Sequence, residues 1–421
     1  MRSALVYGLF AFAAGAGLGM TCTPAAAAPV DVKLWRHETG DSEMLASADA
    51  VLRFNQRQSQ YRIVTETLPQ GSYLQSVVAA AMTRKLPCVL DLDQPNVANF
   101  AWAGHIQPLE RSLRPAGADA LIPGARSLYK DKLYAVGQFD VALTLFARKS
   151  TLASHGVRVA TLAQPYTADE FRTILRRLKA AGVKYPLDLN TQWGGEWVAY
   201  AFAPWLQSAG GDLIDRQTFT RVDGLLNSDT ALKVLDYYQS LFNERLASRR
   251  PVDDQAFPSG RAVFQYTGSW SAPDYRQKFG DDLLAMPPPS FGATPKIGSG
   301  SWQWAVSRSC PQPEGARLFL EHLISTDEIT RFSKATGMMP TSEAAADATA
   351  LYRKGAFGRD FFELARAFAV ARPETPGYPM ISSSFERALK EVREGGDAAD
   401  ALDRAVEAIS QDLKRNRNYG Y

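Results

Sequence analysis

Tryptophan side chains at the ends of predicted strands are the residues of this chain best suited to hold a ligand. The stretch RAVFQYTGSW, residues 261–270, is typical of a short buried strand that a glycine ends, which leaves Trp270 on the following loop. Trp35, Trp193 and Trp302 also lie at predicted strand ends or in loops. An indole ring can cover the apolar face of a cyclic ligand, and its alternative role is packing at the edge of the core. We expect ligand contact from these four rings, with Trp270 foremost.

Polar side chains accompany these rings at the predicted strand ends. The candidates are His37, Glu38, Asp93, Gln94, Asp140 and Glu196. Carboxylates, amides and imidazoles suit a ligand rich in hydroxyl groups, because a hydroxyl that is buried without a partner costs about 1 to 3 kcal/mol. Structural alternatives exist for several of them: helix capping for His37 and Asp93, a solvated loop position for Glu38, and favourable charge at a helix start for Glu196.

Catalytic and metal chemistry is not indicated. The sequence contains no G-x-S-x-G or H-E-x-x-H motif, and its four histidines show no metal-ligand spacing. We therefore expect no enzymatic activity, no metal and no cofactor. A pair of carboxylates such as Glu38 and Glu196 could serve a glycoside hydrolase, but their separation does not follow from sequence.

The first 28 residues are typical of a signal peptide. Arg2 provides a positive start, an apolar stretch follows from about residue 4 to 20, and four small residues, Ala25–Ala28, form a cleavage site near Ala28. A lipid anchor on Cys22 is not expected, because Thr21 and Gly19 do not match the residues that such a signal requires. The rest of the sequence contains no segment apolar enough to cross a membrane. We expect the mature chain to be exported and soluble.

Charge and cysteine content bear on the binding partners of the protein and on its disulfide bonds. The net charge of +3 is small, both signs are interspersed, and no basic block points to nucleic acid. Two cysteines remain after the signal peptide. Cys88 lies in an apolar strand-like run and Cys310 in a proline-rich loop, so we expect them to be unpaired, although an exported chain could join them.

Predicted strands and helices alternate along the first half of the chain. Strands are predicted at 30–35, 61–68, 88–92, 185–189 and 299–307, with helices at 72–84, after Thr167, and through most of the last hundred residues. The mature chain of roughly 390 residues is longer than one core usually supports, so we expect two lobes. The extended segment 133–147 suits a crossing from one lobe to the other. Such alternation predicts an α/β fold with mostly parallel sheets and ligands at the carboxyl ends of strands. We assign Trp102, Trp197, Trp205 and Trp304 to packing.

In their order and spacing, several stretches resemble one known family. These are VKLWRHETGD, FAWAGHIQPLE, DKLYAVGQFDVALTLFARKS, LQSAGGDLID, RAVFQYTGSW, SWQWAVSRSCPQPEGARLFLEHLIS and GGDAADALDRAVEAISQDL. They resemble the extracellular solute-binding proteins of ABC importers, in the sugar-binding branch that includes maltose-binding protein. The resemblance implies the two-lobed periplasmic-binding-protein fold with a hinge between the lobes. One lobe would comprise 29–139 and 303–350, and the other 140–302 and 351–421.

The resemblance also implies a function. A monomeric receptor would capture a mono- or oligosaccharide between its lobes and deliver it to permease subunits in the inner membrane. Trp270 would stack on a pyranose, while the HETGD loop, Asp93 and Gln94 would bind hydroxyls. The tail departs from the maltose-type pattern, because Phe385 is the only ring in PMISSSFERAL. A sugar phosphate, polyamine or peptide stays open as an alternative ligand, although Arg36 and Lys296 are the only basic residues at the expected rims.

Overall fold

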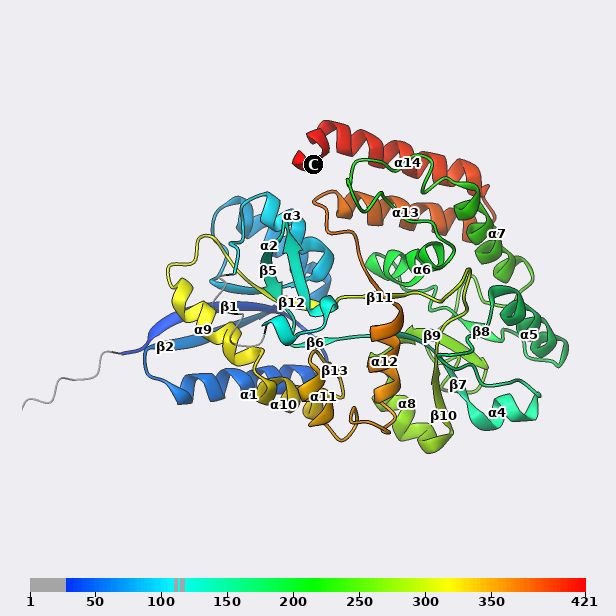
Figure 1. Ribbon diagram of the computed structural model, residues 1–421, viewed down its shortest axis with the longest axis horizontal. Coiled ribbons are helices and arrows are strands. Elements are labelled where there is room, and N and C mark those ends of the chain that lie inside the picture. The colour runs from blue at the N-terminus through cyan, green and yellow to red at the C-terminus, as the bar shows by residue number, and fades with distance from the viewer. Residues whose placement is uncertain (1–27, 110–112, 114–117) are drawn as a thin grey trace, which may run out of the picture.

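A computed structural model describes residues 28–109, 113 and 118–421. The predicted signal peptide lies outside the described residues, apart from Ala28. The described chain forms two α/β lobes, each built on one sheet with helices against it (Figure 1). None of the helices in the described ranges combines the length and the apolar character that a membrane crossing requires.

The first lobe contains a six-stranded sheet in the order β2-β1-β3-β12-β5-β4. Its strands are β1 (Val30–His37), β2 (Tyr61–Leu68), β3 (Val89–Asp93), β4 (Arg126–Tyr129), β5 (Lys132–Val136) and β12 (Trp302–Val306). The helices of this lobe are α1 (Asp41–Arg57), α2 (Tyr73–Met82), α3 (Val97–Trp102), α9 (Pro313–Leu323), α10 (Thr326–Thr336) and α11 (Glu343–Asp347). Both faces of β3 are buried, as its nearly continuous apolar run requires.

The second lobe contains a four-stranded sheet in the order β10-β7-β9-β8. Its strands are β7 (Leu143–Arg148), β8 (Leu187–Asp188), β9 (Phe264–Gly268) and β10 (Leu283–Met286). Around it lie α4 (Lys149–Ser154), α5 (Ala168–Ala180), α6 (Glu196–Ser208), α7 (Asp229–Asn243), α8 (Ala272–Phe279), α13 (Tyr378–Arg393) and α14 (Ala398–Arg415). The side chains of Thr167 and Ser228 cap α5 and α7, as their sequence positions predict.

Both sheets are mixed, so the prediction of mostly parallel sheets is wrong. β1 runs parallel to β2 and β3, but β12 pairs antiparallel with β3 and with β5. In the second sheet, β7 is antiparallel to both β9 and β10. The physical reason is that β12 returns directly from the other lobe and inserts between β3 and β5, without the helical crossover that a parallel neighbour needs.

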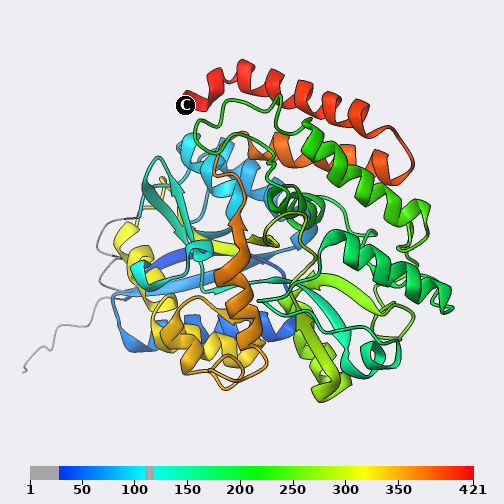
Figure 2. The same cartoon turned by 45° about the vertical axis from the view of Figure 1, so that its right-hand side comes forward.

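Extended segments join the two lobes. The predicted crossing at 133–147 is confirmed, because it passes from β5 in the first sheet to β7 in the second. Between them β6 (Phe139–Asp140) pairs with β13 (Met339–Pro340). A second ribbon pairs β11 (Ile297–Ser299) with β14 (Ala369–Ala371), which follows α12 (Arg359–Phe368). Figure 2 shows α12 running along the junction of the lobes.

The strand predicted at 299–307 is confirmed as β12, over 302–306, but its first residue, Ser299, ends β11, which lies in a different sheet. Gly300, between them, has a φ of 91°, in the left-handed region that few other residues adopt. This turn ends the ribbon and lets the chain enter the first sheet.

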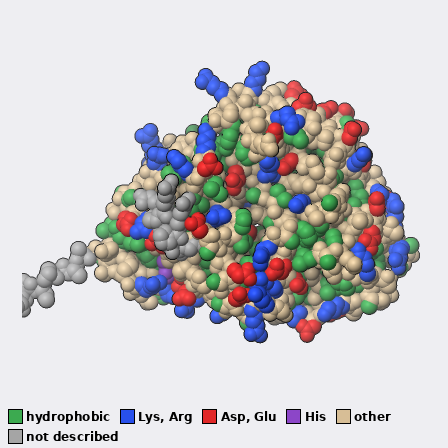
Figure 3. Space-filling model, viewed as in Figure 1, with side chains coloured by type: hydrophobic (Ala, Val, Ile, Leu, Met, Phe, Trp, Pro, Cys, Tyr) green, Lys and Arg blue, Asp and Glu red, His purple; other side chains and the backbone are tan. Residues whose placement is uncertain are grey.

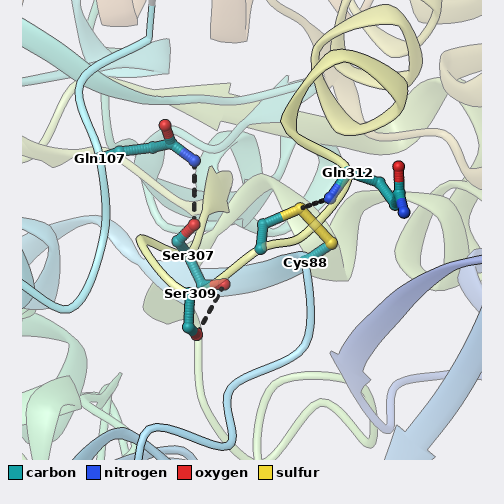
Figure 4. Close-up of a disulfide and its surroundings, with 6 residues drawn as sticks. Cys88, Gln107, Ser307, Ser309 and Gln312 are labelled. Atoms are coloured by element: carbon teal, nitrogen blue, oxygen red, sulfur yellow. Dashed lines mark hydrogen bonds between the residues drawn. A yellow bond between two sulfur atoms is a disulfide. The ribbon is translucent and has the colours of Figure 1, made fainter.

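Cys88 and Cys310 form a disulfide, so the expectation of two unpaired thiols is wrong (Figure 4). Cys88 precedes β3 and Cys310 follows β12. These antiparallel strands pair Val89 with Val306, which brings the two cysteines to the same end, 4.3 Å apart at Cα. A separation of 222 residues hid this proximity in the sequence.

Candidate ligand-binding site

Trp270 lies at the carboxyl end of β9 with its ring over Gly268. A Cβ atom at Gly268 would collide with this ring, so the backbone is bare where the indole lies against it. The ring is half-buried and packs edge-on against Trp197, at 6.1 Å between centroids. Trp193 is also half-buried and meets the same Trp197 at 5.1 Å. Trp197 therefore holds two partly exposed indoles in place from within α6.

The first lobe presents a third indole, Trp302, at the start of β12. It is half-buried and stacks on the His37 imidazole, with centroids 3.5 Å apart and planes 17° apart. The His37 Nδ1 lies 2.6 Å from Asp91 Oδ2, and the His37 backbone N donates to Asp91 Oδ1 at 3.2 Å. The Tyr73 hydroxyl donates to the Asp91 carbonyl at 2.9 Å. His37 is itself buried, so its place is behind Trp302.

Arg372 connects the two lobes. Its Nη1 and Nη2 donate to the Asp93 carboxylate at 3.1 and 2.7 Å, and its Nη1 also donates to Glu196 Oε1 at 3.0 Å. Asp93 ends β3, whereas Glu196 begins α6 beside the other sheet. The guanidinium also lies 5.1 Å from the centroid of the Tyr200 ring. The buried guanidinium of Arg372 thus joins a carboxylate of the first lobe to a carboxylate of the second.

The cluster of Arg372, Asp93 and Glu196 contains two carboxyl groups and one guanidinium. Burial lowers the pKa of Arg372, but the carboxylates of Asp93 and Glu196 outweigh it and raise this pKa well above its ordinary value. Burial raises the pKa of Glu196, and Arg372 opposes that rise. Two hydroxyl groups of α13 also donate to Glu196, that of Tyr378 at 2.5 Å and that of Ser382 at 2.6 Å. Two carboxylates against one guanidinium leave the cluster with negative charge.

The sequence matches a known protein family. A family model described as "Bacterial extracellular solute-binding protein" matches residues 49–357. The chain belongs to the bacterial extracellular solute-binding proteins. This membership confirms the predicted class, a solute-binding protein of an ABC importer that is not an enzyme, and places it with extracellular or periplasmic proteins.

Solved structures of low sequence identity share this fold. The GacH receptor of Streptomyces glaucescens, known with acarbose, is 20% identical, with a TM-score of 0.78 over 92% of this chain and 99% of that one. The cyclic α-maltosyl-1,6-maltose binding protein from Arthrobacter globiformis is 24% identical, with a TM-score of 0.75 over 92% and 100%. The maltose/maltodextrin-binding domain MalE from Bdellovibrio bacteriovorus, bound to maltotriose, is 18% identical, with a TM-score of 0.74 over 91% and 100%. The predicted two-lobed α/β fold is therefore confirmed.

Of the remaining predicted residues of this solute-binding protein, Gln94 and Asp140 lie next to the Arg372 cluster, because Arg372 Nη2 donates to the Gly300 carbonyl at 3.2 Å. Trp35 is half-buried and donates from Nε1 to Glu66 Oε2 at 2.6 Å, and Glu38 is exposed. Gln94 and Asp140 are buried on either side of Gly300, whose backbone N donates to Asp140 Oδ1 at 3.2 Å. The structure thus brings together the pairs Trp193 with Trp270, His37 with Trp302, and Asp93 with Glu196. Gln94 and Asp140 pack around Gly300, between β11 and β12.

Sequence reasoning missed the residues that organise the junction. Arg372 lies in RPETPGYP, a break between helices with no periodic signal, and Tyr200 lies in an apolar helix as one ring among many. Tyr378, Ser382 and Asp91 also act through partners that are distant in sequence. A single arginine in a segment otherwise short of charge was the one available signal. Across the part of the chain that the structure describes, no group of three or more His, Cys, Asp or Glu side chains is placed to hold a metal ion.

Proposed function

We propose that the chain captures a mono- or oligosaccharide between its two lobes, in the periplasm, and delivers it as a monomer to permease subunits in the inner membrane. The observation that carries this proposal is the partial exposure of Trp193, Trp270 and Trp302 beside the bridge formed by Arg372. Trp197 and Trp205, in contrast, are buried as packing residues. Rings left half-open beside polar groups suit a ligand with both apolar faces and hydroxyls.

The chemistry of a pyranose matches these surroundings. Its C–H faces pack on indoles, and its hydroxyls both donate and accept hydrogen bonds. Asp93 and Glu196 have partly exposed side chains, at 21% and 31%, so each retains acceptor capacity beyond its bond to Arg372. We assign ligand contact to these two carboxylates and to Trp193, Trp270 and Trp302. Trp35 and Glu38 extend the proposed surface toward the edge of the first sheet.

Three of the initially expected residues take other roles in this proposal. His37 is buried behind Trp302 and orients that ring, because its own edge is held by Asp91. Gln94 and Asp140 shape the backbone around Gly300. The sugars named for the structural neighbours, from acarbose and maltotriose to α-D-tagatose, support a saccharide and span several sizes.

The excess of carboxylates favours a polyamine as the second candidate. Asp93 and Glu196 share one guanidinium, and Glu38 and Glu66 lie near Trp35, so a cationic ligand would find acceptors. An anionic ligand such as a sugar phosphate is disfavoured, because Arg372 is already bound by two carboxylates.

A thermal-shift panel tests the proposal. The panel contains glucose, maltose, maltotriose, α-cyclodextrin, spermidine and glucose 6-phosphate, added to the processed protein. A saccharide should raise the melting temperature as its concentration rises, because a ligand that binds only the folded state stabilises it. A shift with spermidine or glucose 6-phosphate and none with any sugar would overturn the saccharide assignment. Mass spectrometry of the periplasmic protein tests the cleavage site near Ala28.

A further inference from the structure

A cavity of about 400 Å³ lies at the lobe junction. Ser299, Ala369 and Ala371 of the β11–β14 ribbon line it, whereas the alternate residues Gly298 and Arg372 face Tyr200. Successive side chains of a strand point to opposite faces, so the ribbon lies between this cavity and the proposed sugar-binding residues. We call the latter the saccharide cluster; it consists of Trp193, Trp270, Trp302, Asp93, Glu196 and Arg372. Its volume falls in the range of small-molecule sites.

The carboxylate of Asp140 is the deeply buried charged group in the lining of this cavity, which also includes Glu343 and Arg366. Asp140 is 1% exposed and lines the cavity beside Ser299. Its Oδ1 accepts from the backbone N atoms of Val141, at 2.8 Å, and Gly300, at 3.2 Å. Within the described residues, no hydrogen bond or ion pair reaches Oδ2. Arg372 favours the charged form of Asp140 from nearby, but it forms no hydrogen bond with Oδ2, so this oxygen can accept from a donor that enters the cavity.

Gly124 keeps this oxygen open. Its φ is not in the left-handed region, so its backbone conformation does not require glycine. A Cβ atom there would collide with Asp140 Oδ2 and lie 2.9 Å from Ser299 Oγ. Because Gly124 has no side chain, Asp140 Oδ2 and Ser299 Oγ both face the same space at the bottom of the cavity.

The walls of the cavity are mainly apolar. Leu121 and Ile122 contribute from the first lobe, and Phe362, Ala365 and Ala369 contribute from α12 and β14. Arg366, also in the lining, lies 3.4 Å from Glu343 and is thereby held by another carboxylate. Figure 3 shows acidic and basic side chains gathered over the region where α11 and α12 lie. The cavity thus has apolar walls, charged side chains at its rim and one carboxylate, that of Asp140, at its bottom.

We propose that this cavity binds a small organic ammonium ion. The ammonium group donates to Asp140 Oδ2 and Ser299 Oγ, and the hydrocarbon part packs between Ile122 and Phe362. A neutral alcohol of the same shape loses the charge-assisted bond, and a carboxylate is repelled by Asp140. This site and the saccharide cluster meet at Gly300, whose backbone N donates to Asp140 Oδ1 and whose carbonyl accepts from Arg372 Nη2 at 3.2 Å.

Isothermal titration with benzylamine at neutral pH tests the proposal, with benzyl alcohol and benzoate as matched probes. Benzylamine should bind the wild type, and the two other probes should bind at least about tenfold more weakly. Asp140→Asn keeps an acceptor for the two backbone N atoms and should weaken benzylamine by about tenfold or more. Gly124→Ala fills the space beside Oδ2 and should do the same if Asp140→Asn fails to fold.

Two further variants locate the amine. Asp119→Asn removes an exposed carboxylate of the same lobe and should leave benzylamine affinity unchanged. Trp270→Ala should also leave it unchanged, because Trp270 belongs to the saccharide cluster. The proposal is overturned if the wild type gives no heat with benzylamine, if Asp140→Asn and Gly124→Ala both bind it normally, or if Trp270→Ala abolishes its binding.

Discussion

Arg372 binds Asp93 through two hydrogen bonds although the residues are 279 positions apart in the chain. The same guanidinium reaches Glu196, so one side chain ties the end of β3 to the start of α6. Arg372 is 7% exposed, and its removal would leave two neighbouring carboxylates without their cation. The bridge is therefore a point at which lobe contact and folding stability depend on one residue.

Arg372→Leu should lower the free energy of unfolding by about 2 to 4 kcal/mol. This is less than the loss for a fully buried pair, because the side chains of Asp93 and Glu196 retain partial exposure that screens them. Urea denaturation of the wild type and the variant gives the difference. Arg62→Leu is the matched control, because Arg62 forms an exposed pair with Asp31 and should have little effect. An equal decrease in the free energy of unfolding of both variants would show that the Arg372 bridge contributes no more to stability than an exposed ion pair.

Trp270→Ala should abolish the saccharide-induced thermal shift while the protein stays folded. Gly268→Ala should produce a similar loss, because its Cβ atom collides with the ring and displaces it. Titration of maltose and maltotriose followed by thermal melting measures both effects. Trp102→Ala removes an indole that is 43% exposed and packs against Tyr419, and it should keep the full shift. A normal shift in Trp270→Ala would remove this ring from the binding site.

Much of the fold was predictable because its signals are local. The alternation at 61–68 gave the bounds of β2, and capping residues gave the starts of α5 and α7. The insertion of β12 between β3 and β5 was not predictable, because antiparallel pairing over two hundred residues leaves no periodic trace. The same pairing decides the disulfide between Cys88 and Cys310.

The candidate site was predictable only in part, for the same reason. Indoles at strand ends follow from strand signals, and the structure shows three of them half-buried at the junction. Whether a polar residue such as His37 faces ligand or supports a ring depends on a partner, here Trp302, that lies in a distant strand. Arg372 derives its role entirely from two such distant partners.

Replacing both Cys88 and Cys310 with serine should lower the free energy of unfolding by about 2 to 4 kcal/mol, since the cross-link restricts the unfolded chain. Denaturation with and without dithiothreitol measures the effect. The reductant should destabilise the wild type toward the double variant and leave the double variant unchanged. A wild type that is indifferent to reductant under unfolding conditions would contradict a role for this bond in stability.

Asp140 predicts a definite pH dependence. Burial raises its pKa from 3.8 to about 6, and hydrogen bonds from the backbone N atoms of Val141 and Gly300 oppose that rise. Between these two values the folded state binds more protons at this site than the unfolded state does, so stability falls as pH rises through the window and is level above it. A difference of about 2 pKa units corresponds to about 3 kcal/mol.

Asp140→Asn isolates this contribution. The free energy of unfolding of the wild type minus that of the variant should fall by about 2 kcal/mol between roughly pH 4 and pH 7, because only the wild type must ionise the buried carboxyl group. Urea denaturation at a series of pH values gives the difference. Asp119→Asn, at an exposed position, should show no comparable slope over the same range. A flat difference for Asp140→Asn would mean that the Asp140 carboxyl group titrates in the folded protein as it does in the unfolded chain.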